Sequence, residues 1–329
     1  MSNERKTNGN GKWLWICLLI ILLGLIGLAV KPTLQVINDR ELFEKGDTYG
    51  EKGLFLKKLS LGFGERDLTP KLKNHPYLES LNLNRFKTDL AGLGRLPNLE
   101  TLFLNVEAGT DLSSFPEQFP KLTDLGVAPV DDGACASMKD WPEAWRSQIT
   151  TFNIREWYTD TPPLKDVGLT IEGVQSILEA FPNLTRLRLE GAQLSGKELL
   201  SVNIKKVDLS GKGPQIVPFK ESTIGSLVLN GNELASGALA SLAGSEVQTI
   251  TLSYGQVEND EVFVGELLNI KGLKNAGLNG TNISTNQLRR LCREHPSLEH
   301  VYWFEMSASK DEKNRLKELV AQESNVKLR

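Results

Sequence analysis

The chain has 329 residues, enough for two ordinary domains or for one elongated repeat array. Its composition, 40% hydrophobic and 24% charged, is typical of a folded protein and excludes a predominantly disordered one. The formal net charge is −3 and no basic stripe is present, so we expect no nucleic-acid partner.

Residues 13–30 form an uncharged run, WLWICLLIILLGLIGLAV. As a helix, this run rises about 27 Å, enough to cross a bilayer. Lys12 and Lys31 bracket it, and the basic residues of the segment 1–12 place the N-terminus in the cytoplasm by the positive-inside rule. We therefore expect a cytoplasmic tail at 1–12, a transmembrane helix at 13–30, and a single-pass membrane protein whose remaining residues are extracytoplasmic.

A cleaved signal peptide is the alternative for the same run. Gly27-Leu28-Ala29 supplies the small-x-small pattern that signal peptidases accept, and cleavage would release a secreted protein. The apolar core of a signal peptide is usually about 7 to 15 residues long. Since this run is uniformly apolar beyond that length, the sequence favours an anchor, followed by a polar stalk at 31–53.

Internal repetition is the strongest pattern beyond the stalk. Five segments share a proline followed by an L-x-x-L-x-L pattern, and they begin at His75, Leu96, Phe119, Phe181 and His295. Weaker copies begin at Leu56, Ile149, Ile204, Ile224, Val247 and Leu273. Successive units lie 20 to 35 residues apart, mostly within the range of leucine-rich repeats.

The repeated unit predicts a strand with alternate side chains buried. One such strand cannot bury its face alone, so neighbouring units should stack into a parallel sheet. The return segments beginning at Thr170 and Thr285 carry apolar residues on one helical face. Alternating strand and helix predict an α/β solenoid with a curved parallel sheet, and with helices and irregular turns on its convex side.

These units resemble the leucine-rich repeat proteins of the bacterial type, in the ribonuclease-inhibitor-like or cysteine-containing subclass. The resemblance covers residues 54–305 and includes the turn Leu278-Asn-Gly-Thr-Asn-Ile-Ser284. Cys17, Cys135 and Cys292 form no disulfide framework, which agrees with that type. The resemblance implies the solenoid fold, and it assigns no individual function.

Two segments depart from the repeat. Residues 128–168 form an irregular insertion that contains Trp141, Trp145 and Trp157, which are either interface anchors or fillers of the core. Residues 306–329 predict a C-terminal helix that caps the open end of the array.

No catalytic, cofactor-binding or metal-binding residues are expected. The segment 191–198 resembles a phosphate-binding loop, but Glu198 stands where that motif needs Ser or Thr. The three histidines lack metal-ligand spacing. A site assembled from distant units would be invisible in the sequence, so an enzyme with a dispersed site stays an alternative.

The outward strand positions predict a binding surface for a protein or peptide. Three arginines lie close together there, indicating an acidic ligand or else internal charge pairing. The candidate partner-binding residues are Phe103, Asn105, Asn153, Arg155, Arg186, Arg188, Glu190, Lys206, Asp208 and Asn230, with Trp145 and Trp157 of the insertion. A structural envelope protein is the other alternative, and the oligomeric state stays open.

Overall fold

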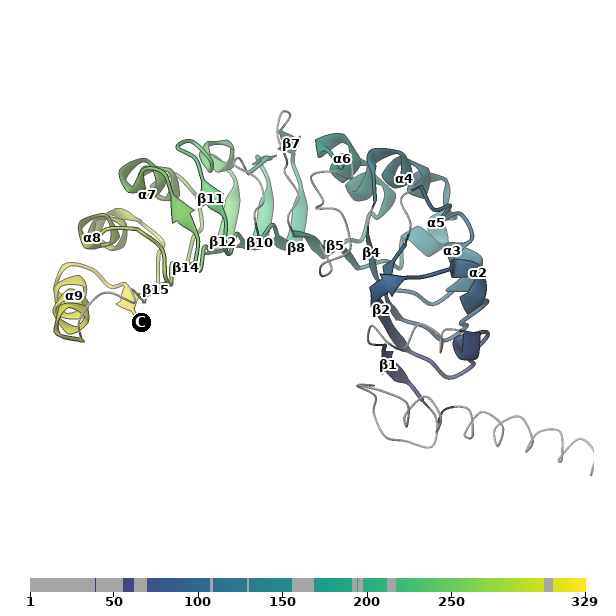
Figure 1. Ribbon diagram of the computed structural model, residues 1–329. Helices are drawn as coiled ribbons and strands as arrows, with labels where there is room; N and C mark the ends of the chain where they lie inside the picture. Colours follow the sequence, from purple (N-terminus) through teal and green to yellow (C-terminus); the bar gives the residue numbers. More distant parts are fainter. Residues whose placement is uncertain are drawn as a thin grey trace, which may run out of the picture.

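The computed structural model describes residues 39, 56–61, 70–106, 109–128, 130–155, 169–190, 194, 198–211, 217–304 and 310–329. In this part of the chain, the strands form one long curved sheet along the inner side of an arc, and the helices lie along its outer side (Figure 1). The observed architecture is an α/β fold that fits a leucine-rich repeat solenoid.

Twelve strands make up the main sheet of the described residues, and every neighbouring pair is parallel. In spatial order they are β1 (Lys58–Ser60), β2 (Ser80–Lys87), β3 (Thr101–Asn105), β4 (Asp124–Ala128), β5 (Thr151–Arg155), β6 (Arg186–Glu190), β8 (Asn203–Asp208), β10 (Thr223–Val228), β12 (Glu246–Thr251), β14 (Asn275–Gly277), β15 (His300–Tyr302) and β16 (Lys327–Leu328). Eleven of these strands belong to the eleven predicted units.

The core lies between this sheet and the convex segments. Alternate strand residues such as Leu102, Leu104, Leu187 and Leu189 are almost completely buried, as the L-x-L pattern predicts. Equivalent positions of neighbouring strands pair directly, for example Phe152 with Leu187. Each unit therefore buries its apolar face against its neighbours.

Helices form the convex side of most units (Figure 1). They are α2 (Leu90–Leu93), α3 (Phe115–Gln118), α4 (Asp132–Ser137), η2 (Met138–Asp140), α5 (Glu143–Arg146), α6 (Ile171–Ala180), η4 (Ala240–Leu242), α7 (Asp260–Leu268), α8 (Thr285–Glu294) and α9 (Lys310–Glu323). Thr170 caps α6, Asn259 caps α7 and Ser284 caps α8 by accepting hydrogen bonds from backbone N–H groups of the first turn. The predicted helices after Thr170 and Thr285 are both present.

Short strands replace helices in the central convex region. β7 (Leu199–Leu200) pairs with β9 (Phe219–Lys220), and β11 (Glu233–Leu234) pairs with β13 (Gln256–Val257). Asn232 is fully buried here, and its Nδ2 donates to the carbonyl oxygens of Leu209 and Leu229 over 2.8 and 3.0 Å. The buried amide thereby joins the turns of two consecutive units.

The two ends of the array differ from the sequence-based expectation. Within the predicted stalk, Asp39 is buried and accepts hydrogen bonds from Leu56 N–H and from His75 Nε2, so this residue packs onto the first units. At the other end, β16 follows α9 and pairs with β15. The C-terminal segment therefore adds a strand as well as the predicted helix.

No helix of the described residues is both long and apolar enough to span a membrane. The predicted tail at 1–12 and transmembrane helix at 13–30 lie outside the described residues.

Candidate functional site

The concave face of the sheet presents the candidate residues in rows that run across the strands. One row contains Asp124, Thr151, Arg186, Lys206 and Ser226 in successive strands. The next row contains Phe103, Gly126, Asn153, Arg188 and Asp208. The sheet thus brings candidates from distant units onto one surface, as the repeat predicts.

Arg186 and Lys206 are direct partners in the register of β6 and β8. Both residues are exposed. Among the described side chains, neither forms a hydrogen bond or an ion pair. Two cations therefore stand side by side at the centre of the concave face.

Arg188 is in a different situation because an acidic residue stands beside it. Its Nε lies 3.4 Å from Asp208 Oδ2, and the two side chains are 34% and 13% exposed. Asp208 Oδ1 also accepts hydrogen bonds from Ser210 N–H and Ser210 Oγ–H, over 3.1 and 2.6 Å. The alternative of internal charge pairing thus applies to Arg188.

Arg155 and Glu190 are register partners at the ends of β5 and β6. Their side chains lie outside the described part of the structure. Asn153 is half-buried and stands beside Arg188 in the register.

Two of the candidate asparagines serve the fold. Asn105 is only 5% exposed, so its side chain offers little surface to a partner. Asn230 Oδ1 accepts a hydrogen bond of 2.8 Å from Ser253 N–H, which joins two consecutive turns.

Phe103 lies flat on the concave face over the neighbouring strand. A Cβ atom added to Gly126 would stand 2.2 Å from Phe103 Cδ1, so the ring occupies the space above that glycine. Gly126 therefore provides room for the ring of Phe103, because a larger side chain at this position would collide with it.

The insertion contains core aromatic residues. Trp145 is 6% exposed, its Nε1–H donates to Phe119 O over 2.9 Å, and its ring makes an edge contact with Trp141 at a centroid distance of 5.0 Å. The expectation that Trp145 binds a partner is therefore corrected, because packing against these rings removes it from the surface. Trp157 lies outside the described residues.

Exposed aromatic residues occur instead at the C-terminal end of the array. Tyr254, Tyr302 and Phe304 are 71%, 37% and 52% exposed, and we call these three residues the aromatic patch. Sequence reasoning compared only the central position of each strand, so it missed Tyr254 and Phe304, which lie beyond the strands. It also overlooked Tyr302, which occupies that central position and pairs with Gly277 in the register. A tyrosine at a turn position that is glycine in neighbouring units was the available signal.

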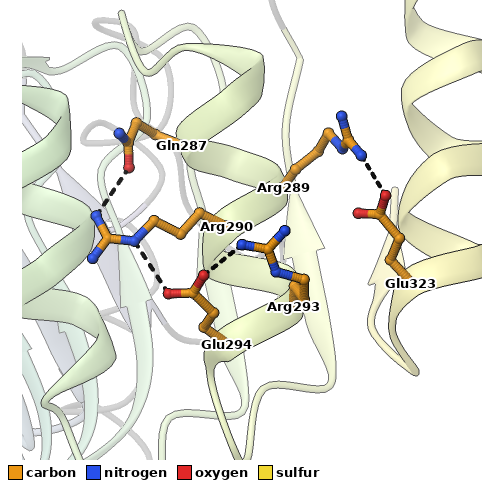
Figure 2. A network of polar contacts seen from close by, with 6 residues as sticks. All are labelled: Gln287, Arg289, Arg290, Arg293, Glu294 and Glu323. Carbon is orange, nitrogen blue, oxygen red and sulfur yellow. Dashed lines mark hydrogen bonds and ion pairs between the residues drawn. The ribbon is translucent and has the colours of Figure 1, made fainter.

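The convex arginines of α8 are paired with acidic and amide side chains (Figure 2). Glu294 accepts from Arg290 Nε over 3.2 Å and from Arg293 Nη2 over 2.6 Å, while Arg289 pairs with Glu323 of α9. Hydrogen bonds from Arg293 and then Arg290 lower the pKa of the Glu294 carboxyl. The positive charges of the α8 arginines are thus offset by neighbouring carboxylates, unlike those of Arg186 and Lys206.

The buried cysteines are poor candidates for reactive groups. Burial raises the pKa of Cys135 and of Cys292 to about 12, so both thiols are protonated at neutral pH. Within the described residues, no group of three or more His, Cys, Asp or Glu side chains could hold a metal ion.

Comparisons with known proteins concern the fold and leave the function open. No family model matches the chain, and no curated protein matches it. Among solved structures, a chain from "Crystal structure of TLR13-ssRNA13 complex" is 16% identical, with a TM-score of 0.38. The match covers 79% of this chain and 48% of that chain, so this protein spans about half of its length.

Proposed function

We propose that this protein is a membrane-anchored, non-catalytic binding module whose concave face takes an acidic segment of a protein or peptide. The observation that carries the proposal is the register pairing of Arg186 with Lys206, two exposed cations without a partner among the described side chains. An extended curved surface on a rigid repeat array is suited to such a ligand.

Electrostatics favours an anion at this position. Like charges on directly opposite strand residues destabilise a sheet. At about 4.8 Å, the spacing of neighbouring strands, two unit charges repel each other by about 0.9 kcal/mol even in a water-like dielectric. A carboxylate placed between Arg186 and Lys206 would add two attractions that offset this repulsion, so an acidic ligand gains affinity from both residues.

Selection of peptides tests the proposed ligand class. A library of random displayed peptides, long enough to cross the concave face, would be selected on the full chain in phosphatidylcholine nanodiscs. We expect enrichment of Asp and Glu, and a loss of affinity of at least about tenfold in the variant R186A/K206A.

A matched double variant controls for net charge. Lys73 and Arg95 are exposed cations in the segments that precede β2 and β3, so K73A/R95A removes the same charge elsewhere. Affinity should be unchanged in this control. Selected peptides without acidic enrichment, or equal losses in both double variants, would contradict the proposed ligand.

Anchoring is the second part of the proposal and has its own test. The uncharged run 13–30 supports retention in the membrane, with the N-terminus in the cytoplasm and the array outside. We expect the protein to stay with the membrane pellet after carbonate extraction and to keep its apolar run. A mature chain that begins near Val30 and washes off membranes would identify a secreted protein instead.

A further inference from the structure

One turn position has a positive φ angle in four consecutive units. It is occupied by Gly211, Gly231, Tyr254 and Gly280, with φ angles of 96°, 73°, 57° and 67°. The four N–H groups make equivalent hydrogen bonds, each to the carbonyl oxygen of a residue in the next unit. The position is therefore structurally the same in each unit, and Tyr254 stands where the others have glycine.

Tyrosine is an unfavourable choice for this turn. Positive φ costs a side-chain-bearing residue free energy that glycine does not lose. The ring regains little by burial, because Tyr254 is 71% exposed. Its contact is with the bare backbone of Gly280, where an added Cβ would stand 2.8 Å from Tyr254 Cδ1. The fold alone gives no reason for a tyrosine here, and strained exposed residues of this kind are typical of functional sites.

Two further rings and two cations complete this surface. Phe304 accepts the hydrogen bond from Gly280 N–H through its carbonyl oxygen, so it lies in the unit next to Gly280. Lys313 Nζ stands 4.0 Å from the centre of the Phe304 ring, and Arg329 stands 5.7 Å from the centre of the Tyr302 ring. Exposed rings bordered by cations suit an apolar side chain with carboxylates near it.

We propose that the aromatic patch is the anchor site for an aromatic or large aliphatic side chain of the same acidic ligand. This inference rests on the proposed function and specifies its ligand. Three strand spacings separate β6 from β12, which precedes Tyr254, and five separate β6 from β15, so the distances are about 14 and about 24 Å. An extended peptide covers these distances in about four and about seven residues. The ligand is therefore an acidic segment with an apolar anchor residue about four to seven positions from the carboxylates that contact Arg186 and Lys206.

Three variants separate the ring from the backbone of the turn. Tyr254→Gly removes the ring and also the free-energy cost of the positive φ angle. Tyr254→Ala removes the ring and keeps that cost, and Phe304→Ala removes a second ring. We expect the denaturation midpoint of Tyr254→Gly to equal or exceed that of the unchanged protein, and that of Tyr254→Ala to be lower than that of Tyr254→Gly. A peptide selected on the full chain should lose at least about tenfold in affinity for each Tyr254 variant.

The outcomes distinguish this inference from the proposed function. Support requires selected peptides that combine acidic residues with an apolar residue, and affinity that falls in both Tyr254→Gly and R186A/K206A. Acidic peptides that bind Tyr254→Gly with full affinity would overturn the anchor site and leave the proposed function standing. Apolar peptides that need Tyr254 but ignore R186A/K206A would overturn the proposed function, and with it the shared ligand.

A second copy of the chain is the other candidate occupant of the aromatic patch, and a separate measurement tests it. Light scattering on the full chain in nanodiscs measures association of particles as concentration rises. Association that Tyr254→Gly abolishes would show that the patch is a self-interface and would overturn the peptide anchor. We expect particles that remain separate in both the unchanged protein and the variant.

Discussion

Arg188 Nε lies 3.4 Å from Asp208 Oδ2, directly across the register between β6 and β8. Asp208 therefore offsets the positive charge of Arg188, which is one of the arginines that the acidic ligand would contact. Replacing Asp208 by Asn keeps an acceptor for Ser210 and removes the negative charge. We expect acidic peptides to bind this variant about fivefold more tightly, since about 1 kcal/mol of repulsion disappears. Isothermal titration measures this change, and weaker binding would contradict the expected ligand charge.

The core prediction concerns Leu187, which is 1% exposed. Leu187→Ala should lower the free energy of unfolding by about 2 to 5 kcal/mol, because it leaves a cavity between stacked units. Arg188→Ala is the matched control, since the adjacent side chain points to the concave face. Its cost should stay below about 1 kcal/mol. Urea denaturation followed by circular dichroism would show equal losses if the inward and outward positions were misassigned.

The stacked sheet was predictable because each unit repeats the same inward leucines. Eleven strands follow from the L-x-x-L-x-L pattern, and the helices after Thr170 and Thr285 follow from apolar periodicity and capping residues. β16 was not predictable, because Lys327 and Leu328 carry too short an alternation to indicate a strand. Pairing with β15 supplies the hydrogen bonds that fix it.

His295 predicts a pH dependence of stability. Its Nδ1 accepts a hydrogen bond from Ser297 N–H over 3.3 Å, and its Nε2 lies 3.2 Å from Ile270 O, so the buried ring is neutral with the proton on Nε2. Burial lowers the pKa of His295 below 6.5. Between the folded pKa and 6.5, the unfolded chain binds more protons than the folded protein, so this contribution to stability is complete above 6.5 and declines as the pH falls.

His295→Asn isolates this contribution because Asn keeps an acceptor near Nδ1 and cannot be protonated in this range. The fall in urea midpoint between about pH 7.5 and pH 5 should be smaller in the variant than in the unchanged protein. All other residues are the same in both proteins, so the comparison isolates position 295. An identical pH dependence in the two proteins would show that His295 is not buried in its neutral form.

Trp145 should behave as a core residue. Trp145→Ala should lower the free energy of unfolding by about 3 to 5 kcal/mol through the lost contacts with Trp141 and the hydrogen bond to Phe119 O. Trp145→Phe keeps a ring and should cost less. The affinity of the folded fraction for acidic peptides should match that of the unchanged protein. Lost affinity without lost stability would return Trp145 to the binding surface.

The candidate site was only partly predictable from the sequence. The concave positions of Arg186 and Lys206 follow from their place beside Leu187 and Val207 in the pattern. Their direct pairing does not, because β7 lies between β6 and β8 in the sequence yet belongs to a different sheet. The exposure of Tyr254 depends on a φ angle and on the bare backbone of Gly280, and neither is visible in strand periodicity.

Photocrosslinking tests most directly whether the concave face binds the acidic ligand. Benzoylphenylalanine would replace Asn153 on the concave face, or Gln175, an exposed residue of α6 on the convex side. With a selected acidic peptide, we expect crosslinking at position 153, loss of that crosslink in R186A/K206A, and no crosslink at position 175. Crosslinking at position 175 with none at position 153 would contradict binding on the concave face.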